Sequence, residues 1–298
     1  MSSGSSYYLS PLRYPGGKGR LAGFVGSLLE AQPRCRPQYV EPFAGGAGVA
    51  LRLLVDEYVD EIVLNDLNPG IAAFWRSVFY ETEDFICLLN MCDVTVEEWH
   101  RQHEIYCSLE SGELELGFAT FFLNRTNRSG ILNARPIGGL RQTGTWKIDA
   151  RFDKASLIAR IRTLSPYESR VTVCEEDGIG LIERFITDGR SFIYADPPYL
   201  TQGDDLYLDT LQWKDHQRLA SLLRDADGWF LTYDADPRIA NELYAGLRCA
   251  EFQTSHTAAV QHVGREYAVF ARSLRVPSLT KLGSRNARFV SDRPIDGR

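Results

Sequence analysis

The stretch Ser191–Leu200, with the sequence SFIYADPPYL, constrains the fold more than any other part of the chain. Residues 191–195 are apolar and partly β-branched or aromatic, which predicts a short buried strand. Pro197 and Pro198 have no backbone N–H and a restricted φ, so the strand must end at Asp196. A rigid turn that carries a carboxylate after a strand is typical of the ligand-binding edge of an open α/β sheet.

The turn itself combines a carboxylate, a proline carbonyl and an aromatic ring, from Asp196, Pro197 and Tyr199. Two hydrogen-bond acceptors beside a stacking ring suit a flat heterocycle that carries an exocyclic amino group. The alternative is an ordinary exit from a strand into a loop, because Asp-Pro and Pro-Pro pairs are common turn signals.

Two glycine-rich turns precede helical patterns near the N-terminus. Pro15-Gly16-Gly17 is followed by Lys18 and a helix from about Leu21, an arrangement that can hold an anion. A strand over 38–43 leads into a second turn, 44–48, and a helix over 49–56, the nucleotide-binding start of a doubly wound sheet. Neither turn has the G-x-G-x-x-G or Walker A spacing, which disfavours a pyrophosphate-holding site.

Further strand ends carry acids. The strand predicted over 61–65 ends at Asp66, which can accept hydrogen bonds from ribose hydroxyls, and a strand over 170–174 is followed by Asp177. Because parallel strands end at a common edge, the glycine turn, Asp66, Asp177 and Asp196 are expected to meet there. That edge would form a pocket for an adenosine-like cofactor. Further strands are expected over 228–233, 249–253 and 267–271, with helices over 71–80, 179–186, 214–224 and 237–244.

Residues 81–165 interrupt this alternation with helical patterns over 84–91, 96–108 and 114–124. Residues 120–170 hold ten Lys and Arg against three acids, although the whole chain has a net charge of −6. Such a basic segment is what a phosphate-contacting surface would look like. The loop within it is expected to display Arg125, Arg128, Asn133 and Arg135, residue types that grip phosphates and read base edges. The alternative is a loop held together by its own Asn and Arg hydrogen bonds.

The composition excludes several functional classes. The 298 residues are 44% hydrophobic and 24% charged, and no apolar run reaches the length of a membrane span. The six cysteines show no metal-ligand spacing, so we expect reduced thiols, no metal site and a cytoplasmic protein. None of the five histidines lies in a motif, which disfavours histidine-based acid–base chemistry.

Five motifs occur in a characteristic order: RYPGGKGRL at 13–21, VEPFAGGAGVAL at 40–51, LNDLNPGI at 64–71, NRTNRSGILN at 124–133 and ADPPY at 195–199. With these motifs the chain resembles the Dam-like family of DNA adenine-N6 methyltransferases over residues 10–271. The resemblance implies a Rossmann-like class I methyltransferase of the α/β class, with a doubly wound, mostly parallel sheet and a mainly helical inserted target-recognition domain. Tyr14 stands where many members carry Trp, and either ring can stack.

The resemblance also implies a cofactor, a substrate and roles for individual residues. The methyl donor would be S-adenosyl-L-methionine, and the acceptor would be N6 of an adenine flipped out of double-stranded DNA, in a site-specific reaction. The catalytic turn would be Asp196, Pro197, Pro198 and Tyr199. The cofactor would contact Tyr14, Lys18, Phe43, Ala44, Gly45, Asp66, Asp177 and Asp196.

The resemblance divides the chain into four parts. Residues 1–80 and 166–271 would form the catalytic domain, 81–165 the target-recognition domain, and 272–298 a basic, flexible tail. The family suggests a bacterial or phage-encoded, nucleoid-associated enzyme with restriction or defence proteins as possible partners. Two alternatives stay open: a methyltransferase for RNA or a protein amide, and a catalytically idle DNA-binding accessory subunit.

Overall fold

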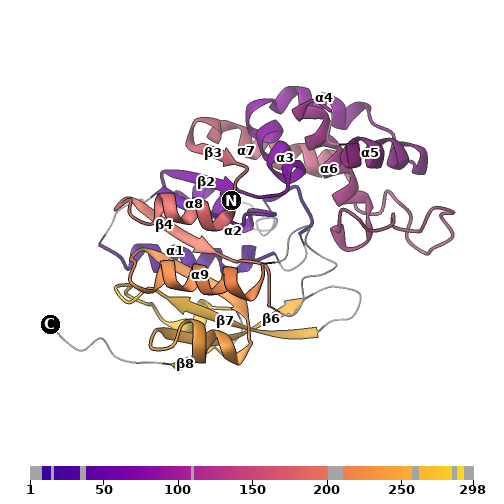
Figure 1. Ribbon diagram of the computed structural model, residues 1–298. Coiled ribbons are helices and arrows are strands. Elements are labelled where there is room, and N and C mark those ends of the chain that lie inside the picture. The colour runs from indigo at the N-terminus through magenta and orange to yellow at the C-terminus, as the bar shows by residue number, and fades with distance from the viewer. Residues whose placement is uncertain are drawn as a thin grey trace.

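In the computed structural model, one mixed sheet organises the part of the chain that the structure describes, namely residues 9–14, 17–33, 38–108, 111–200, 211–256, 262–283 and 287–291. Its eight described strands run in the order β3-β2-β1-β4-β5-β7-β6-β8 (Figure 1). The strands are β1 (Gln38–Glu41), β2 (Glu61–Asn65), β3 (Val171–Cys174), β4 (Ser191–Ala195), β5 (Trp229–Asp234), β6 (Arg248–His256), β7 (His262–Phe270) and β8 (Arg288–Ser291).

The first five strands of the chain are parallel, and the last three extend the sheet in antiparallel fashion. From β1 the chain moves outward through β2 to β3, then crosses back to β4 on the other side of β1. The strand order therefore reverses between β1 and β4, which pair directly with Val40 opposite Ile193. In open α/β sheets, the crevice beyond such a reversal is where ligands bind.

Helices cover both faces of the sheet. The α-helices are α1 (Ala22–Glu30), α2 (Gly48–Val55), α3 (Pro69–Tyr80), α4 (Thr82–Met91), α5 (Val96–Ser108), α6 (Glu113–Thr126), α7 (Lys154–Leu164), α8 (Gly178–Phe185) and α9 (Trp213–Arg224). Short turns of other helical type are η1 (Gly19–Leu21), η2 (Arg128–Gly130), η3 (Ser165–Arg170), η4 (Ile239–Leu243) and η5 (Leu279–Lys281). None of the helices in these described ranges is both long and apolar enough to cross a bilayer.

The alternation along β5 shows which helices cover which face. Phe230 packs against Phe24 of α1, whereas Tyr233 packs against His216 of α9. Positions 230 and 233 point to opposite faces of a strand, so α1 and α9 lie on opposite sides of the sheet. Figure 1 shows α8 with α9 on the near side of the sheet and α1 with α2 behind it. The parallel strands β4 and β5 are buried on both faces, as their apolar sequences predict.

A helical lobe of α4, α5, α6 and α7 stands at the β3 end of the sheet (Figure 1). It is joined to the rest by a cluster of buried rings in which Phe74 of α3 packs on Phe85 of α4 and on Phe121 of α6. Phe152, which precedes α7, completes the cluster by packing on Phe121. The lobe therefore shares its core with the helix that follows β2.

Most of the expected elements are present with ends that differ by one or two residues. Among the strands, β7 begins five residues before the expected start at 267, and β6 ends three residues after the expected end at 253. Helix α7 has no counterpart among the elements expected from the sequence. The helix expected over 237–244 is present over 237–243, and its last five residues form the π turn η4. The expectation of a tail over 272–298 is wrong for residues 288–291, because β8 pairs with β6 there and Leu282 is fully buried nearby. Residues 284–286 and 292–298 of that tail, and Pro15 and Gly16 of the first glycine turn, lie outside the described residues.

Candidate active site

Asp196 follows β4 directly and lies at the point where the strand order reverses. Its two carboxylate oxygens are held from two sides. Thr232 of the neighbouring strand β5 donates a hydrogen bond of 2.7 Å to Oδ1, and the Nζ of Lys18 lies 3.2 Å from Oδ2. The side chain keeps 23% of its surface exposed. The carboxylate is therefore fixed in direction and still reachable from solvent.

Lys18 connects Asp196 to a second buried acid. Its Nζ lies 3.3 Å from Oε1 of Glu266 on β7 and donates a hydrogen bond to the hydroxyl of Tyr199. The Tyr199 hydroxyl in turn donates to Glu266 at 3.1 Å, and Thr254 of β6 donates to the same acid at 3.0 Å. The catalytic turn predicted from the sequence is thus anchored at both its carboxylate and its ring.

Burial and charge act against each other in this cluster. Burial alone would lower the pKa of Lys18, but the Asp196 and Glu266 carboxylates outweigh it and raise that pKa above its ordinary value. Removal from water raises the pKa of Asp196, an effect that the Lys18 ammonium opposes and the Glu266 carboxylate strengthens. One cation therefore serves two acids that would otherwise repel each other.

The second glycine turn, after β1, is tied to the end of β2 by Asp66. Its Oδ2 accepts a hydrogen bond from the backbone N–H of Gly45 at 2.9 Å, and its Oδ1 accepts one from Asn68 at 3.0 Å. Burial raises the pKa of Asp66 to about 6, although these two bonds favour the ionised form. Gly45 has a φ of 46°, and a Cβ there would overlap the ring of Tyr14. The turn is therefore a glycine cradle with an aromatic wall on one side and a carboxylate on the other.

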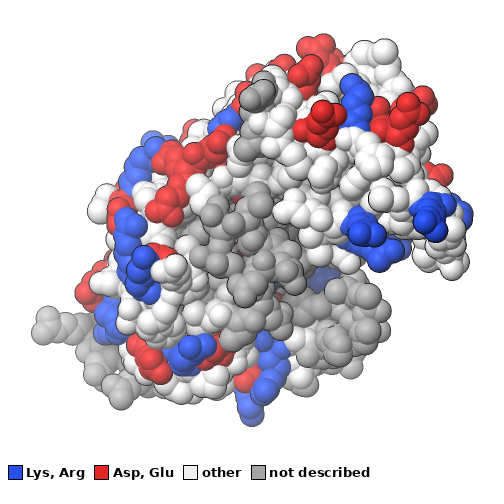
Figure 2. All heavy atoms as spheres, turned by 45° about the vertical axis from the view of Figure 1, so that its right-hand side comes forward, with Lys and Arg blue, Asp and Glu red and all other residues white. Residues whose placement is uncertain are grey.

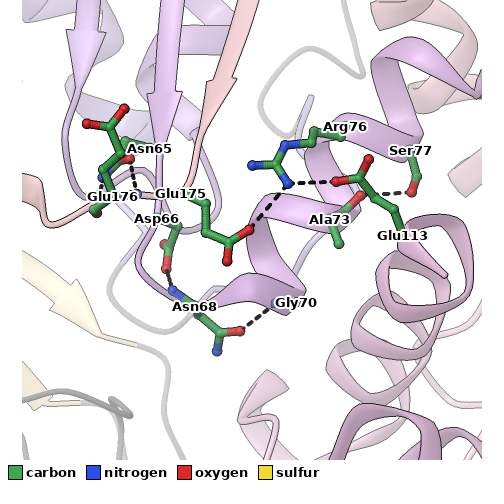
Figure 3. Close-up of polar contacts among 10 residues, drawn as sticks. All are labelled: Asn65, Asp66, Asn68, Gly70, Ala73, Arg76, Ser77, Glu113, Glu175 and Glu176. Carbon is green, nitrogen blue, oxygen red and sulfur yellow. Dashed lines mark hydrogen bonds and ion pairs between the residues drawn. The ribbon is translucent and has the colours of Figure 1, made fainter. Parts of the chain in front are cut away.

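Asn65, the last residue of β2, is joined to Glu176 after β3 (Figure 3) and also to Pro42 after β1. Its side-chain amide donates to the carbonyl of Pro42 and to that of Glu176, while its Oδ1 accepts from the Glu176 N–H. This places Phe43 beside Asp177, and a Cβ on the intervening Gly178 would collide with the Phe43 ring. Asp177 itself caps α8 by accepting from Ile179 and Gly180. Phe43 and Asp177 thus line the same edge as Asp66.

The structure brings most of the predicted cofactor and catalytic residues to one edge of the sheet. Ala44 follows Phe43 and donates its N–H to the Asn65 carbonyl at 2.8 Å. Pro197 is buried and Pro198 half-buried, between Asp196 and Tyr199. Residues of these types at one edge can hold a nucleoside between rings and carboxylates and present its far end to Asp196. Within the described ranges, no cluster of His, Cys, Asp and Glu could bind a metal ion.

The four residues predicted to contact DNA divide into two groups. Arg128, Asn133 and Arg135 are exposed, and the Arg128 N–H donates to the Arg135 carbonyl at 3.1 Å, so the loop doubles back on itself. Figure 2 shows Lys and Arg gathered on the lower edge of the helical lobe and acids on its upper side. Arg125 instead points inward, where it donates to the backbone carbonyls of Arg151 and Pro11.

The asparagines of the same motif hold the loop together. Asn124 accepts from the Arg13 N–H at 2.7 Å and donates to the carbonyls of Arg13 and Gly130. Asn127 accepts from the indole N–H of Trp99 at 2.6 Å and donates to two carbonyls of the loop. The alternative of a loop held by its own hydrogen bonds therefore describes Asn124 and Asn127, while the exposed residues beyond them are free to act at the surface.

Sequence reasoning missed Glu266 and Thr232. Thr232 lies within the strand that was expected over 228–233, where nothing marks it as different from its neighbours. Glu266 directly precedes the strand expected at 267–271, and the only available signal is a charge at the start of an apolar run. Neither position could be linked to Asp196 without knowing the order of the strands.

The sequence of the chain is similar to those of known DNA methyltransferases. A family model described as D12 class N6 adenine-specific DNA methyltransferase matches residues 14–255. Modification methylase StsI of Streptococcus sanguinis is 26% identical over 216 residues, which cover 67% of this chain and 30% of that protein. Type II methyltransferase M.MjaIII of Methanocaldococcus jannaschii is 23% identical over 203 residues, which cover 63% of this chain and 68% of that protein.

Among solved structures, the rRNA methyltransferase aviRa from Streptomyces viridochromogenes is similar over 90% of this chain and 92% of that chain. The identity is 13% and the TM-score 0.40, a likeness too low to bear on function.

Proposed function

The chain belongs to the family of D12 class N6 adenine-specific DNA methyltransferases, and we propose that it transfers a methyl group from S-adenosyl-L-methionine to N6 of an adenine flipped out of duplex DNA. The observation that carries this proposal is the position of Asp196. It lies at the reversal of the strand order, with one oxygen fixed by Thr232 and the other by Lys18, beside the ring of Tyr199. This is an acceptor beside an aromatic ring, as an adenine amino group requires.

The residues around the glycine turn fit an adenosine-containing cofactor. The turn leaves no room for a side chain at Gly45, because the Tyr14 ring covers it. The Asp66 carboxylate stands ready to accept hydrogen bonds from ribose hydroxyls, and Phe43 with Asp177 would hold the adenine. Ala44 and Lys18 would complete the set of cofactor contacts, and Lys18 also contacts Asp196. When bound, S-adenosyl-L-methionine supplies an electrophilic methyl group.

The catalytic turn would make a poor nucleophile reactive. The lone pair of the adenine N6 is delocalised into the ring, so the amine attacks only when that nitrogen becomes pyramidal. Hydrogen bonds from N6 to the Asp196 carboxylate and the Pro197 carbonyl favour this geometry and stabilise the positive charge that develops on nitrogen. Lys18 and Thr232 keep the carboxylate in place before the base arrives, so little reorganisation is needed.

The substrate would reach this edge as a flipped base. A base inside a duplex is inaccessible, and stacking on Tyr199 would offset about 1–3 kcal/mol of the lost base stacking. The exposed basic loop beyond α6 carries Arg128, Arg135 and Asn133, and it also exposes 70% of Trp146. Cationic side chains with an exposed ring suit contact with phosphates and bases. We therefore assign the DNA-binding face to this loop.

A methyl-transfer assay with labelled S-adenosyl-L-methionine tests the proposal on duplex DNA, RNA and protein acceptors. We expect label on N6 of adenine in duplex DNA. Asp196→Ala should reduce transfer by about a thousandfold, while the affinity for the cofactor weakens by less than about tenfold. Asp227→Asn, an exposed acid in the loop before β5, is the matched control and should retain full activity.

Other results would redirect or refute the assignment. Label only in RNA or in a protein amide would replace the DNA substrate with that acceptor. Cofactor and DNA binding without any transfer would support the idle accessory subunit. Full activity in Asp196→Ala would refute the mechanism.

A further inference from the structure

A cavity lies away from the glycine turn, between the end of α6, the turn before α7 and the first turn of α7. Its volume is about 380 Å³. The lining includes Arg125, Arg151, Arg160, Phe152, Asp153 and Ser156. The mechanism above uses none of these residues. Three guanidinium groups in one open cavity suggest a bound anion.

Two of the three lining arginines are held by backbone carbonyls rather than by acids. Arg125 donates to the carbonyl of Arg151, and Arg160 donates to the carbonyl of Ser10 at 3.1 Å. Arg13 lies close by and donates to the Asn127 carbonyl at 3.1 Å. Over the described residues, none of these arginines makes an ion pair. Carbonyls orient a guanidinium but do not neutralise its charge.

The crowding of positive charge is visible at Arg125. Burial, together with repulsion from the neighbouring Arg13, Arg160 and Arg151, lowers the pKa of Arg125 to about 9. Its Nε is buried without a hydrogen-bond partner in the described part of the chain. A buried donor left unsatisfied costs about 1–3 kcal/mol. An anion in the cavity would relieve both the repulsion and the desolvation of this group.

The acids at the cavity do not neutralise the charge of the arginines. Asp153 caps α7, with its Oδ1 facing the N–H of Ser156 at 3.5 Å, and Asp149 is exposed on the turn before it. Two carboxylates thus face four guanidinium groups, which leaves the cluster positive. The N-terminal end of α7, an 11-residue helix, borders the same cavity through Ser156 and adds a favourable dipole for an anion.

We propose that this cavity binds a phosphate group, through the guanidinium groups of Arg125, Arg151 and Arg160. Planar guanidinium groups bind phosphate oxygens in pairs and at short range. The phosphate could come from the backbone of bound DNA or from free inorganic phosphate. The DNA source rests on the proposed function, whereas the inorganic source does not.

Three variants separate the cavity from the rest of the surface. Arg151→Gln removes a lining guanidinium but keeps the backbone carbonyl that Arg125 uses, so the fold is retained. Arg160→Gln removes a second one. Arg162→Gln is the control, because Arg162 lies on the same helix, with 61% of its side chain exposed, and faces Glu83 instead.

The first measurement is thermal unfolding in inorganic phosphate and in chloride at equal ionic strength and pH. Phosphate should raise the Tm of the wild type and of Arg162→Gln by about 2–4 °C relative to chloride. Arg151→Gln and Arg160→Gln should lose this rise.

The second measurement is the slope of log K, where K is the binding constant for duplex DNA, against the logarithm of the salt concentration. The slope should become shallower by about one in each cavity variant if the backbone supplies the phosphate.

The outcomes are separable. Loss of the phosphate effect without a change in slope supports the cavity with free phosphate as its source. A change in slope in the cavity variants alone supports the DNA backbone. If both cavity variants match Arg162→Gln in both measurements, the proposal is overturned. A wild type that fails to methylate DNA would refute the proposed function and leave the phosphate-dependent Tm shift to be judged by itself.

Discussion

The ammonium group of Lys18 lies 3.2 Å from the carboxylate of Asp196, although Lys18 precedes the first strand of the sheet and Asp196 follows the fourth strand of the chain. The same ammonium group lies 3.3 Å from Glu266, near the other end of the protein. A single buried cation thus joins the first glycine turn, the catalytic turn and the antiparallel part of the sheet. The following predictions begin with this cluster.

Replacing Lys18 with Met should leave two buried acids facing each other. Removing one partner of a buried ion pair costs about 3–5 kcal/mol, so we expect a marked loss of stability. The ammonium group opposes the rise in the pKa of Asp196, so that pKa should climb further in the variant. The acidic limb of the activity profile should then move to higher pH.

Chemical unfolding and a pH series of methyl-transfer rates measure these two effects. Adding Glu266→Gln to Lys18→Met should recover part of the lost stability, because it removes one of the two unpaired acids. If the double variant recovers no stability relative to Lys18→Met, Lys18 does not pair with both Asp196 and Glu266.

Substitutions at Tyr199 should separate the ring from the hydroxyl. Tyr199→Phe keeps the stacking surface but loses the bonds to Lys18 and Glu266, so it should reduce the transfer rate by only several-fold. Tyr199→Ala also loses stacking of about 1–3 kcal/mol and should be slower by a further tenfold or more. Single-turnover rates, with base-flipping fluorescence as a second readout, distinguish the two. Equal losses in both variants would count against stacking on this ring.

Glu41 should make the stability of the protein depend on pH. Burial raises the pKa of Glu41 from 4.5 to about 8, although bonds from Tyr39 and from the Ala50 N–H oppose this. The native state therefore holds a proton that the unfolded chain releases from about pH 4.5 upward. Stability should fall as the pH rises from about 4.5 to about 8, by on the order of a few kcal/mol.

Urea unfolding between pH 5 and pH 9 measures this dependence. Glu41→Gln imitates the protonated acid and should flatten the curve, whereas Glu30→Gln, at an exposed position in α1, should leave it as it is in the wild type. A wild-type curve that rises across this interval would show that Glu41 is ionised in the folded protein.

The exposed basic loop should act on DNA and not on the cofactor. Arg128→Ala should weaken duplex binding about tenfold and reduce the salt slope by about one, because one phosphate contact is lost. Cofactor affinity should stay unchanged, since Arg128 lies outside the glycine cradle. Fluorescence anisotropy with labelled DNA and calorimetry with the cofactor provide the two measurements, and Arg162→Ala is the control. Equal losses for both ligands would contradict the assignment.

Asn127 should matter for folding more than for base recognition. Its fully buried amide joins Trp99 to the loop, and Asn127→Ala would leave the indole N–H and two carbonyls without this partner. We expect a loss of stability of about 2 kcal/mol. Asn133→Ala, at an exposed position of the same loop, should be close to neutral in the same unfolding measurement. A larger loss of stability in Asn133→Ala than in Asn127→Ala would show that Asn127 does not support the loop.

The sequence was sufficient to predict the edge where the site lies. The residues next to each strand end carry a recognisable signal. These signals are the double proline after Asp196, the glycine turn before α2, and Asp66 after a strand of five residues. These signals need no knowledge of distant contacts. Asp66 bonds to Gly45, and Asp196 contacts Lys18. The ends of parallel strands lie at one edge of a sheet, which brings Gly45, Asp66 and Asp196 to the same side.

What could not be predicted depends on pairings between distant parts of the chain. Glu266 reaches Lys18 only because β7 pairs with β5 in antiparallel fashion, and no periodicity in the sequence encodes that neighbour. Helix α7 is a different case, because Leu157, Ile161 and Leu164 follow its spacing and Asp153 caps it. Its signal was present but was masked by the surrounding basic residues.

The hairpin of β6 and β7 has an evolutionary consequence. A shortened chain that stopped after β5 would keep the five parallel strands, the glycine cradle and the DPPY turn. It would nevertheless lose the acid that helps to hold Lys18 and Tyr199, together with the Thr254 hydroxyl that positions this acid. Deletions that reach into this hairpin should therefore be selected against.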